Sequence, residues 1–106
     1  MTSSVNKYDT LEQIIFEQGL RIVGVHAYQK LDLLLFVLST GRVLQYKISS
    51  SSRLRKASQE GLNEHELIAG GVGVHWPEVD EDLSLKGLLK ESLQSEYATS
   101  VWAMAA

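Results

Sequence analysis

Cysteine is missing from this chain, and its absence removes a whole group of functions. None of the 106 residues is a cysteine. Disulfide scaffolds, thiolate catalysis and cysteine-ligated zinc or iron–sulfur centres are therefore excluded. A small domain without disulfides is compatible with a reducing compartment, so we expect a cytoplasmic protein.

Long apolar runs are absent as well. No run of apolar residues exceeds six, as over 33–38, whereas a membrane-spanning helix needs about 20. The opening stretch, MTSSVNKYDT, lacks the apolar segment of a secretory signal. We therefore expect no membrane partner.

Acidic residues are missing from one stretch of the chain and concentrated in another. Residues 42–56 contain no acid, and their cations are Arg42, Lys47, Arg53, Arg55 and Lys56. Four acids follow later, at Glu78, Asp80, Glu81 and Asp82. The net charge of −3 argues against a general nucleic-acid binder. The basic stretch is either a solvated surface or a face that binds a partner and accelerates association by steering.

The periodicity of the apolar residues predicts an α+β protein with a mostly antiparallel sheet of about four strands. We expect strands near 20–28, 31–38, 42–48 and 72–76, and helices near 10–18, 52–60, 83–91 and 93–104. Connections between the first three strands are too short for crossover helices, so these strands form a meander. The strand over 33–38 is apolar at every position, which predicts that both of its faces are covered. Residues 1–106 are treated as a single domain.

The two ends of the chain carry further helix signals. Thr10 is the expected N-cap of the first helix, with Gln13 completing a capping box. In the tail, Leu93, Tyr97 and Val101 are four residues apart, and Trp102 lies beside them. This amphipathic pattern predicts a helix that docks on its own chain, on a partner, or on a second copy as a homodimer.

The segment GGVGVHWPEVDEDLSL, residues 70–85, holds most of the residues that could carry chemistry. It fails as a dinucleotide fingerprint because Trp76 stands where the third glycine is required. A zinc-protease motif also fails, since His65 and Glu66 are followed by Ala69 where a second histidine is needed. We assign the segment a structural role, with these residues forming it: Gly71, Gly73, His75, Trp76, Pro77, Asp80, Asp82 and Ser84.

Within that structural interpretation, Trp76 is expected in the core. Asp80 and Asp82 are expected to precede a helix and to bind its first N–H groups. We predict no cofactor, no metal and no catalytic residue.

One long segment, residues 38–89, resembles a known family. Its motifs are Gly41, Arg53-Leu54, Ala57, Gly71 to Pro77, Asp80 to Ser84 and Gly87 to Leu89. In this pattern the chain resembles the bacterial family called domain of unknown function 2442, and it departs at Ser51-Ser52, where relatives often carry Tyr-Pro. The resemblance implies a small α+β module over 38–89, with 90–106 as a helical extension, and no established activity. It also implies gene pairs with domain of unknown function 4160 that are suggestive of toxin–antitoxin operons, and fusions to a helix-turn-helix.

Three functional hypotheses follow from these observations. The first is a non-enzymatic protein-binding module, the antitoxin-like half of a two-gene system, which contacts its partner through the basic stretch and the C-terminal helix. The second is a transcription-linked domain that touches DNA through the same cations, with binding that weakens steeply with salt. The third is a small metal-dependent hydrolase built on His75, Asp80 and Asp82.

Overall fold

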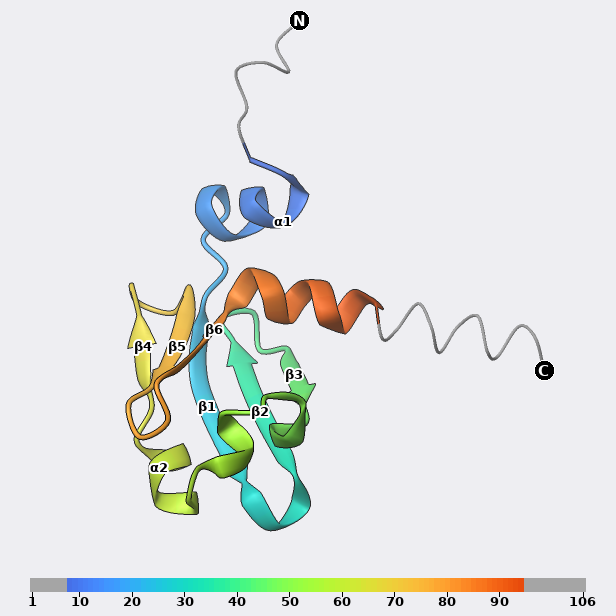
Figure 1. Ribbon diagram of the computed structural model, residues 1–106. Coiled ribbons are helices and arrows are strands. Elements are labelled where there is room, and N and C mark those ends of the chain that lie inside the picture. Colours follow the sequence, from blue (N-terminus) through green and yellow to red (C-terminus); the bar gives the residue numbers. More distant parts are fainter. Residues whose placement is uncertain (1–7, 95–106) are drawn as a thin grey trace, which may run out of the picture.

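The chain folds into two three-stranded antiparallel sheets with short helical segments around them (Figure 1). The computed structural model describes residues 8–94. The first sheet has the order β1 (Ile22–Tyr28), β2 (Leu33–Leu38), β3 (Val43–Tyr46), and the second has the order β4 (Glu66–Ile68), β5 (Gly73–Trp76), β6 (Glu81–Ser84). The helical segments are α1 (Thr10–Glu12), η1 (Gln13–Glu17), η2 (Gln29–Leu31), η3 (Ile48–Ser50), η4 (Leu54–Lys56), α2 (Gln59–Asn63) and a helix over 85–94. The predicted α+β class is confirmed.

The first sheet is the predicted meander. Phe36 on β2 pairs with Val25 on β1 and with Leu44 on β3, and all three side chains are buried. Side chains alternate between the two faces of a strand. Leu34 and Leu38 are therefore buried on the same face as Phe36, and this face meets the core.

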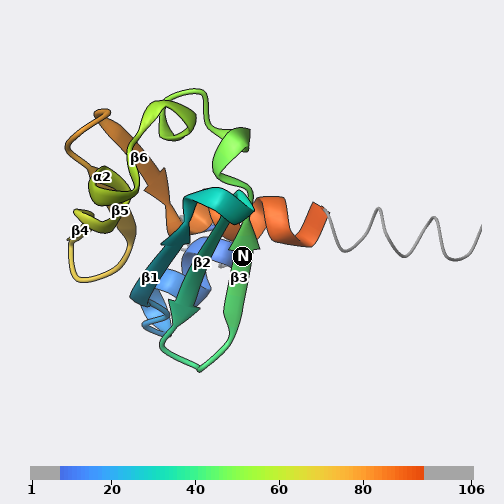
Figure 2. The ribbon, with the colours of Figure 1, turned by 90° about the horizontal axis from the view of Figure 1, so that it is seen from below.

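The second sheet corrects the prediction of one sheet of about four strands. The strand predicted near 72–76 is present as β5, but it pairs with β4 and β6 and not with the first sheet. β6 occupies residues that were expected to begin the helix near 83–91. The reason is the turn that ends at Asp80, where a φ of 51° reverses the chain so that Glu81 lies opposite Trp76. The two sheets lie on different sides of the molecule in the view from below (Figure 2).

Two helix predictions need correction in their extent. The helix predicted near 52–60 is divided into η4 and α2, because Ala57 is extended, with φ −77° and ψ 149°, and Ser58 then caps α2. The helix predicted near 83–91 begins at residue 85 and continues to residue 94. Of the helix predicted near 93–104, only residues 93 and 94 are described, and they belong to this same helix.

The first helix is capped one residue earlier than predicted. Asp9, and not Thr10, is the N-cap, and Glu12, and not Gln13, closes the capping box. The Asp9 carboxylate accepts the Glu12 backbone N–H at 2.8 Å, and the Glu12 carboxylate accepts the Asp9 N–H at 3.0 Å. Both acids also lie near Lys86, at 2.8 and 3.5 Å, which ties this helix to the helix over 85–94.

The core lies between the two sheets. Phe36 and Trp76 meet edge to face, with ring centroids 6.4 Å apart, and both are fully buried. The turn between β4 and β5 contacts β1 directly, where Ile22 N–H donates to the Gly71 carbonyl at 2.8 Å. Within residues 8–94, no helix is long and apolar enough to cross a membrane.

Candidate functional site

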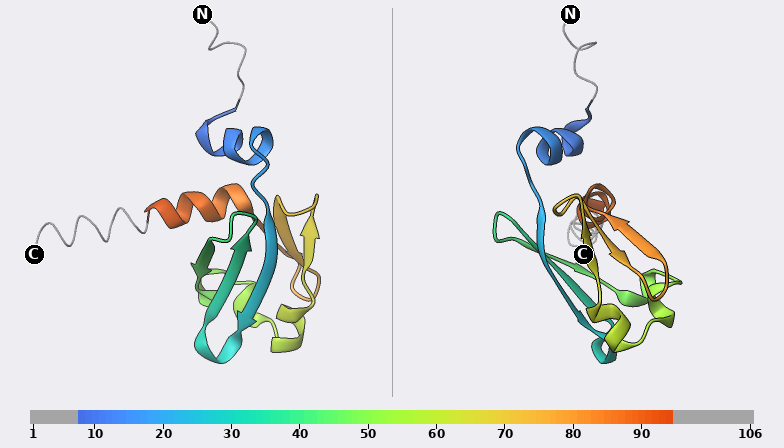
Figure 3. Two further views of the ribbon diagram at one scale, coloured as in Figure 1. Left: turned by 180° about the vertical axis from the view of Figure 1, so that it is seen from behind. Right: turned by 90° about the vertical axis from the view of Figure 1, so that its left-hand side faces the viewer.

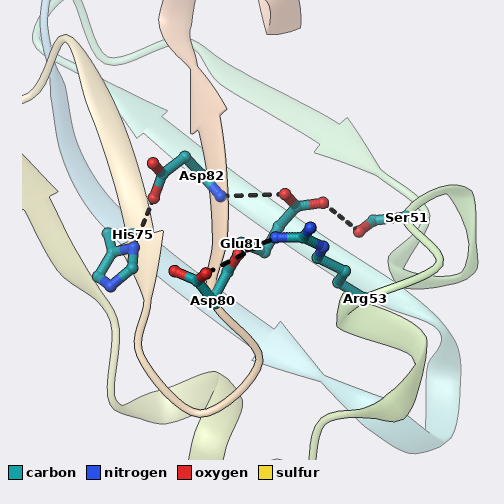
Figure 4. Close-up of polar contacts among 6 residues, drawn as sticks. All are labelled: Ser51, Arg53, His75, Asp80, Glu81 and Asp82. Carbon is teal, nitrogen blue, oxygen red and sulfur yellow. Dashed lines mark hydrogen bonds and ion pairs between the residues drawn. The ribbon is translucent and has the colours of Figure 1, made fainter.

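The segment over 70–85 forms the β5–β6 hairpin and the approach to it (Figure 4). Asp82 lies on β6, and Asp80 lies in the turn before it, so neither carboxylate caps a helix. That prediction is wrong. The residue that caps the helix over 85–94 is Ser84, whose hydroxyl accepts the Gly87 N–H at 3.0 Å.

His75 and Asp82 form a cross-strand pair. They are direct partners in the β5–β6 register, and His75 Nδ1 lies 2.5 Å from Asp82 Oδ1. This hydrogen bond, with smaller contributions from the charges of Asp82, Glu66 and Asp80, raises the pKa of His75 above its usual value. The Asp82 side chain is 67% exposed and that of His75 is 30% exposed. The pair is thus a surface contact that braces the hairpin.

The neighbouring acids bind the segment that carries η3 and η4 (Figure 4). Arg53 donates to the backbone carbonyl of Asp80 and lies 3.9 Å from its carboxylate. The buried Ser51 hydroxyl donates to Glu81 at 2.5 Å. These contacts connect the β5–β6 hairpin to the chain that follows β3.

The three side chains of the hydrolase hypothesis do not converge. Asp82 faces His75, whereas Asp80 faces Arg53 (Figure 4). In the described range, 8–94, no group of three or more histidine or acidic side chains is placed to hold a metal ion. The arrangement therefore offers bracing contacts and no cluster of ligands.

Trp76 occupies the position in the core that was predicted for it. Its side chain is fully buried, and the indole N–H donates to the Leu62 carbonyl at 3.1 Å. Pro77 follows directly and begins the turn, with the Asp80 N–H 3.4 Å from its carbonyl. Gly73 on β5 is buried, and a Cβ there would lie 3.1 Å from the Leu83 carbonyl. These residues shape the scaffold.

The basic stretch is distributed over several elements. Arg42 and Lys47 flank β3 at its two ends, and both are exposed. Arg55 and Lys56 are exposed on η4, and Arg53, just before it, is engaged with Asp80. Tyr97, Val101 and Trp102 lie outside the described residues.

The face of the first sheet that points away from the core is unusually apolar. We call it the outer face, and its side chains come from alternate positions of the three strands: His26, Tyr28, Leu33, Leu35, Val37, Val43 and Gln45. Tyr28 and Val43 are 47% and 50% exposed. Seen from behind, the sheet has no other described element in front of it (Figure 3). The prediction that both faces of the 33–38 strand are covered is therefore wrong for residues 8–94.

A groove runs along the free edge of the first sheet. Its volume is about 490 Å³, and it is lined on one side by β3 with both flanking cations and on the other by Leu88, Glu91 and Ser92 of the helix over 85–94. Tyr46 lies in this wall. Burial, together with the nearby carboxylates of Glu91 and Glu81, raises the pKa of its hydroxyl. We call this feature the β3 groove.

Several polar residues that fix these surfaces were missed at the sequence level. Glu78 accepts the Ser58 N–H at 2.8 Å and its hydroxyl at 2.9 Å. Gln59 donates to the Ala27 carbonyl at 2.9 Å and accepts the Gln29 N–H at 2.8 Å. These contacts join positions 20 to 32 residues apart, so no local sequence pattern predicts them.

Comparison with known proteins gives relatives without a described function. A family model described as "Protein of unknown function (DUF2442)" matches residues 22–94. A crystal structure of a protein of unknown function from Rhodospirillum rubrum is 26% identical, with a TM-score of 0.60 over 68% of this chain and 87% of that one. A solution structure of an uncharacterized protein from Chromobacterium violaceum is 24% identical, with a TM-score of 0.62 over 85% of this chain and 79% of that one. No protein with a curated description matches the chain.

Proposed function

Because this chain belongs to a family whose function is undescribed, we propose a function from its surface: it is a non-enzymatic module that binds a partner protein. The observation that carries this proposal is the apolar outer face of the first sheet. An antiparallel sheet with one face on the core normally presents polar side chains on the other. Here the central strand places Leu33, Leu35 and Val37 on that face, each half-buried.

The composition of the outer face supports a protein as the ligand. Contiguous exposed apolar patches on small proteins mark interaction sites, and aromatic residues are enriched at such sites. Tyr28 and Val43 extend the patch onto both neighbouring strands. Apart from the Tyr28 hydroxyl, the polar side chains on this face are His26 and Gln45. A partner that covers the face would bury the second side of β2, as the sequence of that strand requires.

We further propose that this partner is the product of a neighbouring gene and that the chain is its antitoxin-like counterpart in the cytoplasm. The gene context implied by the family resemblance supports this, and the lack of cysteine is compatible with a reducing compartment. The His75–Asp82 and Arg53–Asp80 contacts then serve to brace the scaffold.

Co-expression with the neighbouring gene product tests the proposal. The two proteins should co-purify, and growth arrest caused by the partner should be relieved. Leu35→Lys and Tyr28→Lys, which place a charge on the outer face, should abolish both effects. Leu67→Lys is the matched control, because Leu67 is 41% exposed but lies on the second sheet.

Thermal unfolding of each variant separates lost binding from lost folding. A folded wild-type chain that neither co-purifies with the neighbouring product nor relieves its toxicity would disprove the antitoxin-like role. Binding that survives both outer-face variants would show that this face is not the interface.

A further inference from the structure

We propose that the β3 groove accepts an extended, acidic segment of a partner protein, which adds to the first sheet as a fourth strand beside β3. This inference rests on the proposed protein-binding function and specifies how part of the partner is held. It is carried by three features of the groove: the unpaired backbone of β3, the helix that faces it, and the two cations at its ends.

Within residues 8–94, the outer edge of β3 has backbone groups that no strand pairs with. Leu38 N–H donates to the Arg42 carbonyl at 2.8 Å, so the carbonyl of residue 42 points toward β2. Directions alternate along an antiparallel strand, and Val43 and Gln45 therefore direct theirs away from β2. In the described part of the chain, β3 pairs with β2 alone. An extended peptide could satisfy these groups by main-chain pairing.

The helix over 85–94 turns this edge into a groove. Leu88, Glu91 and Ser92 line the side opposite β3, and the volume of about 490 Å³ is in the range of ligand sites. A strand rises about 3.4 Å per residue, so a segment of about four residues matches the length of β3. Because the helix lies beside the edge of β3, one added strand fits between them, whereas the edge of another protein's sheet would meet the helix.

Charge complementarity identifies the occupant as acidic. Arg42 and Lys47 stand at the two ends of β3, and the strand between them has no charged residue. Pairing with the β3 edge of a second copy would bring four cations together along one seam, which is unfavourable. A partner segment with acidic side chains at its ends would instead place a carboxylate near each cation. Glu91 on the helix disfavours acids in the middle of that segment.

The experiment uses the full chain and a phage-displayed library of random peptides as the probe. Selected peptides should carry acidic residues around an uncharged centre. Their affinity should fall with salt and drop about fivefold with Arg42→Glu or Lys47→Glu, the size expected when an exposed ion pair is lost. Amide signals of Val43 and Gln45 should shift on binding.

Backbone pairing is tested by Gln45→Pro, which removes an outward N–H while leaving the β2 ladder intact, as edge strands tolerate. It should weaken peptide binding by about tenfold, whereas Gln45→Ala, the matched control that keeps the N–H, should change it less than about twofold. N-methylation of alternate peptide residues gives the same readout without altering the protein. Selection of no peptide, or binding that is indifferent to Gln45→Pro and to N-methylation, would overturn the inference.

A variant of the outer face separates a failure of this inference from a failure of the proposed function. Leu35→Lys should leave peptide affinity unchanged while abolishing capture of the neighbouring gene product. If that product binds through the outer face and no peptide enters the groove, this inference alone fails. If groove peptides bind but no partner covers the outer face, the antitoxin-like assignment alone fails.

Discussion

At the residue scale, Trp76 is the largest fully buried side chain of the described residues. It is fully buried, packs edge to face on Phe36, and donates its indole N–H to the Leu62 carbonyl. We expect Trp76→Ala to lower the free energy of unfolding by about 3–5 kcal/mol, measured by urea denaturation. Trp76→Phe should cost less because most of the apolar volume stays. Equal effects of the two substitutions would show that packing at this position matters little.

The pH dependence of stability should reveal the His75–Asp82 pair. The hydrogen bond to Asp82 raises the pKa of His75 in the folded protein above its unfolded value of about 6.5. Stabilisation is then fully present below about pH 6.5 and is lost as the pH rises through the folded pKa. NMR titration of the His75 ring should show the raised pKa, and Asp82→Asn should return it toward its usual value. An identical titration curve in Asp82→Asn would contradict the pairing.

Sequence reasoning was right for some of these residues and wrong for others. Trp76 was placed in the core correctly, because a large apolar side chain in a strand has one favourable location. Asp80 and Asp82 were assigned to a helix N-terminus, since acids before an apolar helical pattern commonly bind its first N–H groups. The positive φ of Asp80 instead turns the chain back into β6, which pairs with β5. Asp82 then faces His75, and Asp80 faces Arg53. That choice depends on side chains distant in sequence.

At the scale of elements, the helix over 85–94 depends on its cap. The Ser84 hydroxyl accepts the Gly87 N–H at 3.0 Å. We expect Ser84→Ala to lower the free energy of unfolding by about 1 kcal/mol. Ser84→Asp keeps an acceptor and should restore most of the loss, as measured by thermal or chemical denaturation. Failure of Ser84→Asp to recover stability would assign the effect to another role of the hydroxyl.

The elements that were predicted well have a strong apolar period. β1 and β2 follow from runs of apolar residues, β3 follows from alternation after a glycine-containing turn, and the helix near 83–91 follows from its leucine spacing. β6 was missed because its sequence EDLS has three polar residues in four and reads as a solvated turn. The break in the helix predicted near 52–60 was missed as well, since it depends on Glu78 holding Ser58 at the start of α2.

At the scale of the whole molecule, Gly71 lies where the turn between β4 and β5 contacts β1 of the other sheet. Its φ is 122°, and a Cβ there would lie 2.3 Å from the Ile22 carbonyl, within the backbone of β1. We expect Gly71→Ala to destabilise the protein by more than the roughly 1–2 kcal/mol cost of a left-handed residue alone, because the sheets must also separate. Gly70→Ala, at φ 73° with open space around its Cβ, is the matched control and should show only the smaller cost.

Differential scanning calorimetry of the two glycine variants measures this difference directly. A Gly71→Ala protein as stable as Gly70→Ala would mean that the close approach at Ile22 contributes nothing.

The division into two sheets was not predictable from strand patterns, because such patterns fix which residues face inward and not which strands become neighbours.

The order of the strands also bears on how quickly the chain reaches this arrangement. In the described residues, each strand pairs only with strands next to it along the chain, so β1 to β3 and β4 to β6 are built from adjoining hairpins. Pairing two strands that adjoin in sequence closes a short loop and therefore costs little conformational entropy. We therefore expect the docking of the two sheets, which brings the Ile22 N–H to the Gly71 carbonyl, to be slower than the formation of either sheet.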